Sequence, residues 1–76
     1  MPKDLPDWEK TVQTLLKVEI LKRNLTYRQV SEKLAAMGVQ ESEPNIRNKL
    51  ARGTFGAVFL IQCLEAIGCC SLQLSE

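Results

Sequence analysis

Residues 25–74 have the sequence LTYRQVSEKLAAMGVQESEPNIRNKLARGTFGAVFLIQCLEAIGCCSLQL, in which caps, apolar positions and glycines predict three successive helices. Thr26 is a suitable N-cap for the first of them, which should run from Tyr27 to about Met37. Gly38 suits the left-handed position at which a helix ends. The inward stripe of this helix is expected to consist of Val30, Leu34 and Met37.

A second helix is predicted over residues 43–52, with Ser42 as N-cap and Gly53 as its end. Its only large apolar residues are Ile46 and Leu50, which stand one helical turn apart. The helix should therefore bury a thin stripe and expose the rest of its surface. The polar side chains that it would present are Asn45, Arg47, Asn48, Lys49 and Arg52.

The third helix of this stretch is predicted from Phe55 to Ile67, with Thr54 as N-cap and Gly68 as its end. It is apolar on nearly every side, which is typical of a central helix or of one shared with another subunit. The tail alternates Cys70, Leu72 and Leu74, and we expect it to be extended or to form a short closing turn.

Before this stretch, Asp7 is a plausible N-cap and Asn24 a plausible stop for another helix. Its apolar arc is wide enough to contact more than one neighbour. The residues of this arc are Trp8, Val12, Leu15, Leu16, Val18, Ile20 and Leu21. Residues 1–6 hold two prolines and should form a flexible leader. The expectation is a single helical, all-α domain over residues 7–76.

The composition argues against several functions. An odd number of cysteines, two of them adjacent, does not make a disulfide framework, and the lack of histidine disfavours a metal site. The chain carries no nucleophile–base motif and no phosphate-binding glycine loop, so neither catalysis nor a cofactor is expected. No apolar stretch has the length of a membrane span. The expected location is the cytoplasm, where cysteines stay reduced. Cys63 should be a small core residue, and Cys69 and Cys70 should carry reduced thiols.

The polar face of the helix over residues 43–52 has the side chains that DNA recognition needs. Asparagine can pair with adenine N6 and N7, arginine with guanine O6 and N7, and lysine with phosphate. Backbone N–H groups near Thr26, Tyr27 and Arg28 offer a further phosphate contact. The alternative is that this face is only solvated, because Glu41 and Glu43 would repel phosphate and the net charge is only +1.

The order of these signals resembles the lambda-repressor-like helix-turn-helix family, and the chain is similar to a group of small bacterial domains of that type. The resemblance spans about residues 18–74, and rests on LTYRQVSEKL (25–34), Gly38-Val39, Ile46, Leu50 and Arg52-Gly53, with Leu60, Leu64, Ile67 and Ser71-Leu72 beyond them. It implies an all-α bundle of four to five helices that contains a helix-turn-helix. It also implies that the helix over residues 43–52 is the recognition helix and that dimerisation occurs near the C-terminal helix. The resulting candidate DNA-binding residues are Tyr27, Arg28, Gln29, Asn45, Arg47, Asn48, Lys49 and Arg52.

The chain also departs from this family. The turn after Gly38 is longer than usual, Ile46 and Leu50 are more widely spaced, and Glu19 occupies the place of an arginine. We hypothesise that Glu19 pairs with Arg47 inside the bundle.

The leading expectation is a small DNA-binding protein, a transcriptional regulator that reaches the major groove of double-stranded DNA. The alternative is a protein–protein interaction or homodimerisation module on the same fold. It would use Phe55, Phe59 and neighbouring apolar residues.

Overall fold

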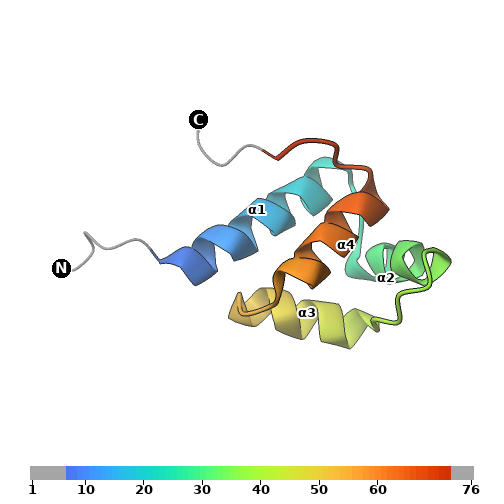
Figure 1. The fold of residues 1–76 in the computed structure, drawn as a ribbon, viewed down its shortest axis with the longest axis horizontal. Coiled ribbons are helices and arrows are strands. Elements are labelled where there is room, and N and C mark those ends of the chain that lie inside the picture. Colours follow the sequence, from blue (N-terminus) through green and yellow to red (C-terminus); the bar gives the residue numbers. More distant parts are fainter. Residues whose placement is uncertain (1–6, 73–76) are drawn as a thin grey trace.

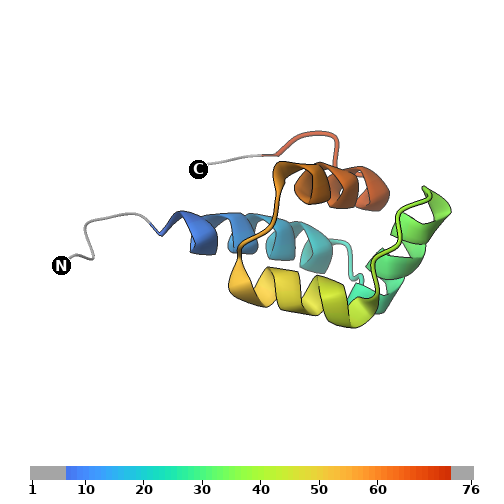
Figure 2. The same ribbon diagram turned by 60° about the horizontal axis from the view of Figure 1, so that its bottom comes forward.

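The computed structural model describes residues 7–72. They form four helices and no strand: α1 (Trp8–Lys22), α2 (Tyr27–Ala36), α3 (Glu43–Arg52) and α4 (Ala57–Ile67). α1 and α2 each pack against both α3 and α4 (Figures 1 and 2). The predicted all-α bundle is thus confirmed over this part of the chain. The leader predicted for residues 1–6 and the tail residue Leu74 lie outside the described residues.

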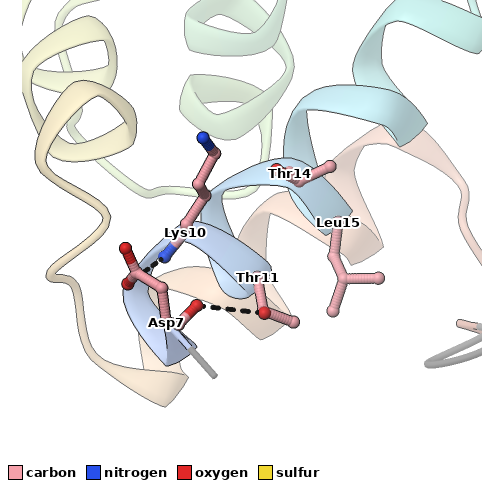
Figure 3. A pocket seen from close by; sticks show the side chains of 5 residues that line it. All are labelled: Asp7, Lys10, Thr11, Thr14 and Leu15. Carbon is pink, nitrogen blue, oxygen red and sulfur yellow. Dashed lines mark hydrogen bonds between the residues drawn. The ribbon is translucent and has the colours of Figure 1, made fainter. Parts of the chain in front are cut away.

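Side-chain caps begin three of these helices as the sequence predicts. The Asp7 carboxylate accepts a hydrogen bond of 3.1 Å from the backbone N–H of Lys10 at the start of α1 (Figure 3). Thr26 and Gln29 form a reciprocal capping box at the start of α2, and Ser42 caps α3. Because each cap pairs a backbone donor that has no partner within its helix, short polar residues fix these three starts.

Residues in the left-handed conformation follow α1, α2 and α3 at the predicted positions. Asn24 has φ 56° and Gly38 has φ 85°. Gly53, with φ 69°, has a second role, because a Cβ atom there would lie 2.6 Å from the backbone oxygen of Glu9. Glycine therefore both ends α3 and allows the first turn of α1 to approach it closely.

The predicted start of α4 is wrong. The helix begins at Ala57 with Gly56 as its N-cap, and no side chain makes the capping hydrogen bond. Phe55 lies before the helix, where its half-buried ring packs edge-on against the Phe59 ring, with 5.2 Å between the centroids. Glycine is a poor helix former but tolerated at the N-cap, so the helix starts after Gly56 and not after Thr54.

Ten apolar side chains drawn from all four helices form the core. They are Leu16, Ile20, Val30, Leu34, Ile46, Leu50, Phe59, Cys63, Leu64 and Ile67. The arc predicted for α1 is wider than the stripe that is buried, since Trp8, Val18 and Leu21 are exposed. Met37, predicted to face inward, is exposed as well.

Cys63 is a core residue, as predicted, and its side chain is fully buried. Burial in apolar surroundings raises the pKa of this thiol to about 12, with a smaller contribution from the nearby Glu41 carboxylate. Cys63 is therefore a neutral packing group at physiological pH.

A hydrogen bond ties the connection between α2 and α3 to the side of α2. The Ser31 hydroxyl donates to the backbone oxygen of Glu41 over 2.6 Å. Val39, at the start of this connection, packs against the core and donates its backbone N–H to the Leu34 oxygen. The connection is thus held at both ends.

Among residues 7–72, no helix combines the length and the apolar character that crossing a membrane requires.

Candidate nucleic-acid interface

The outer face of α3 carries a row of three exposed polar side chains, Asn45, Asn48 and Arg52. Their spacing places them on the side of the helix opposite the buried Ile46 and Leu50. In Figure 2, α3 runs along the lower edge of the molecule, and none of the other helices lies beneath it. Among the described residues, no carboxylate lies within ion-pairing distance of Arg52.

Arg47 also lies on α3 and is exposed, but its guanidinium has two protein partners. Its Nη2 donates to the Glu43 carboxylate over 2.6 Å, one helical turn back. The guanidinium also lies over the Tyr27 ring, 5.8 Å from the centroid. Arg47 is therefore directed along the protein surface and toward the start of α2.

Lys49 is turned toward the bundle. Its Nζ donates to the Glu41 carboxylate over 2.6 Å and lies 4.5 Å from the centroid of the Phe59 ring. Both members of this ion pair are partly buried, so solvent screens it less than the Arg47–Glu43 pair. The positive charge of Lys49 is thus neutralised by the Glu41 carboxylate within the protein.

The start of α2 lies next to α3, as the Tyr27–Arg47 contact shows. Thr26 caps the N–H of Gln29, which leaves the backbone N–H groups of Tyr27 and Arg28 without an intrahelical acceptor. The Gln29 Oε1 atom accepts from the Thr26 N–H, so the Nε2 donor of the same amide remains for another acceptor. The Arg28 side chain is exposed, and its Nε lies 3.6 Å from Glu32.

The hypothesis that Glu19 pairs with Arg47 is wrong. Glu19 is buried on α1, where its carboxylate accepts from Arg23 Nη1 over 2.6 Å and lies 3.5 Å from Lys22 Nζ. The hydrogen bond from Arg23 lowers the pKa of the Glu19 carboxyl, against an opposing effect of burial. Because Arg23 stands one turn away on the same chain segment, this local pair forms in place of the distant one.

The structure thus separates the eight predicted site residues into groups. Asn45, Asn48 and Arg52 share the exposed row. Tyr27, Arg28 and Gln29 gather at the start of α2, where the Tyr27 ring lies beside Arg47. Arg47 and Lys49 are held in ion pairs with Glu43 and Glu41, respectively. The partner Glu43 follows from helical spacing, whereas no local pattern predicts that Glu41 reaches Lys49.

Residues 8–72 match a family described as "Domain of unknown function (DUF6471)". The chain belongs to this family. The match includes all four helices, so the DUF6471 domain comprises the whole bundle and not α2 and α3 alone. Searches of curated proteins and of solved structures gave no match to the chain.

One surface of this DUF6471 domain outside the candidate interface is hollowed. A shallow depression on the outside of α1 is lined by Asp7, Lys10, Thr11, Thr14 and Leu15 (Figure 3). Asp7 and Thr11 are already engaged there, since the Asp7 carboxylate caps the helix and the Thr11 hydroxyl donates to the Asp7 backbone oxygen. Two of the four polar side chains that line the depression are therefore already engaged at the start of the helix.

The predicted apolar docking residues of the DUF6471 domain also need correction. Phe59 is buried in the core and Phe55 is half-buried against it, so the pair does not form an exposed patch. The large apolar side chains that α4 does expose are Val58 and Ile61, with exposed fractions of 70% and 61%.

Proposed function

We propose that the protein binds double-stranded DNA, with α3 entering the major groove and the start of α2 contacting the phosphate backbone. The observation that carries the proposal is the exposed row Asn45, Asn48 and Arg52 on a helix whose outer side is clear of the other helices. These side chains have the hydrogen-bonding groups that match adenine and guanine in that groove.

The neighbouring helix supports this arrangement. The free backbone N–H groups of Tyr27 and Arg28 and the Nε2 donor of Gln29 lie at the positive end of the α2 dipole. Such donors suit phosphate oxygens and would fix the orientation of the protein on the duplex. In this proposal, α2 and α3 act as a helix-turn-helix, and the protein serves as a transcriptional regulator.

The test is the binding of fluorescent random-sequence duplex DNA, followed by anisotropy at several salt concentrations. We expect binding at low salt that weakens as salt rises, because bound phosphates displace counterions from the DNA. Arg52→Ala should lower the affinity, because it removes one of the side chains that meet the duplex. Lys33→Ala removes one positive charge from the far end of α2 and should leave the affinity nearly unchanged.

Amide chemical shifts measured during the same titration locate the surface. Changes at the start of α2 and along α3 are expected. No binding at low salt, or shift changes restricted to α1 and α4, would contradict the proposal.

A second candidate function is self-association through α4. It is favoured by the exposed Val58 and Ile61, which are close neighbours on one face of that helix. If this function operates, sedimentation velocity should show dimers that increase with protein concentration, and Ile61→Asp should abolish them because it places a charge in the apolar contact. A monomer at every concentration would exclude it.

A further inference from the structure

The charges around α3 are arranged in a way that restricts which side chains can select a base. Of the three cations on this helix, Arg47 and Lys49 are each 2.6 Å from a carboxylate, and Arg52 has no such partner among the described residues. The two carboxylates, Glu43 and Glu41, therefore offset two of the three positive charges. This accounts for a recognition surface that is polar but weakly basic.

Geometry adds to the effect of charge. Lys49 has its ammonium over the Phe59 ring, on the side of α3 that faces the bundle. Arg47 lies between Glu43 and the Tyr27 ring, beside the start of α2. Releasing either side chain would break a charge-assisted hydrogen bond and a cation–π contact together. Neither side chain belongs to the outward row.

Resting on the proposed function, we infer that Glu41 and Glu43 withhold Lys49 and Arg47 from the duplex, so that Asn45, Asn48 and Arg52 alone select the bases. The residues of this row span about 10 Å along the helix axis, at 1.5 Å per residue. Base pairs rise about 3.4 Å each, so the row can face three or four successive base pairs. The chemistry that it recognises is the major-groove edge of adenine opposite each amide and of guanine opposite the guanidinium.

The first part of the test uses Glu43→Gln, which removes the carboxylate charge beside Arg47 and keeps the shape of the side chain. Freed from its partner, Arg47 should reach a phosphate and steepen the salt slope by about 0.9, which means about 3.5-fold more affinity gained between 200 and 50 mM salt. The matched control is Glu65→Gln, which changes the same charge on the exposed face of α4 and should leave the slope nearly unchanged. Circular dichroism establishes that both variants fold.

The second part compares base preferences by selection from a random duplex library with wild type, Arg47→Ala and Asn48→Ala. We expect wild type to select a short site with adenine and guanine, Asn48→Ala to lose preference at one position, and Arg47→Ala to keep the wild-type site. A changed site in Arg47→Ala, or equal slopes for Glu43→Gln and wild type, would overturn the inference while wild type still binds DNA. Failure of wild type to bind DNA at low salt would instead remove the proposed function itself.

Discussion

Leu50→Ala is expected to lower the free energy of unfolding by about 2–5 kcal/mol, because it removes buried methyl groups and leaves a cavity. The Leu50 side chain is fully buried and belongs to the core cluster to which all four helices contribute. A domain of this size has a total stability of about 5 kcal/mol. The variant should therefore retain at most about 3 kcal/mol, and circular dichroism should show that it unfolds at a clearly lower urea concentration than wild type.

The matched control is Val58→Ala, which truncates an apolar side chain that is 70% exposed on α4. Its effect on the stability of the monomer should remain within about 0.5 kcal/mol, because the Val58 side chain buries little apolar surface in the folded protein. If the two substitutions lower the free energy of unfolding by the same amount, Leu50 is not part of the core and the packing of α3 described above is wrong.

Gly53→Ala is expected to be the most damaging of the glycine substitutions. A side chain in the left-handed conformation costs about 1–2 kcal/mol. The new Cβ atom would also lie 2.6 Å from the backbone oxygen of Glu9, so α1 and the end of α3 must move apart. Overpacking of this kind adds about 1–3 kcal/mol.

Gly38→Ala separates these two causes. Gly38 has φ 85°, but its Cβ position has no atom within 4 Å, so only the conformational cost applies. Thermal unfolding of both variants should show a clearly larger fall in the melting temperature for Gly53→Ala. Equal falls in the melting temperature would mean that the close approach of Glu9 to Gly53 adds nothing to the destabilisation.

The sequence predicts the ends of α1, α2 and α3 well because local chemistry sets them. Asp7, Thr26 and Ser42 each cap a helix through a hydrogen bond to a residue three positions later. Gly53 takes the left-handed conformation that few other residues tolerate. Such signals need no knowledge of the rest of the fold.

Features that depend on tertiary packing were harder to predict. The apolar arc of α1 is too wide to reveal that Leu16 and Ile20 are buried while Leu21 is exposed. The Thr54-Phe55 pair looks like a cap followed by a helix, but Phe55 packs on Phe59 from outside the helix. A neighbouring element decides which side chains of α1 are buried, whereas the start of α4 depends on Gly56 and on the packing of Phe55 against Phe59.

In the candidate site, too, some features follow from local sequence and others depend on tertiary packing. The exposure of Asn45 and Asn48 follows from the thin apolar stripe of α3, and the pairing of Arg47 with Glu43 follows from helical spacing. The position of Lys49 between Glu41 and an aromatic ring follows from neither, because it depends on how the α2–α3 connection and α4 pass that helix.

The hydrogen bond between Ser31 and the backbone of Glu41 limits how far α2 and α3 can rotate relative to each other. If the two helices bind a duplex as proposed, the distance from the phosphate contacts to the base contacts is set by the protein in advance. If this distance differs from the corresponding distance in straight DNA, the DNA must bend or twist to fit the protein. Flexible pyrimidine–purine steps beside the contacted bases would consequently bind more tightly than stiff ones, even though no side chain touches them.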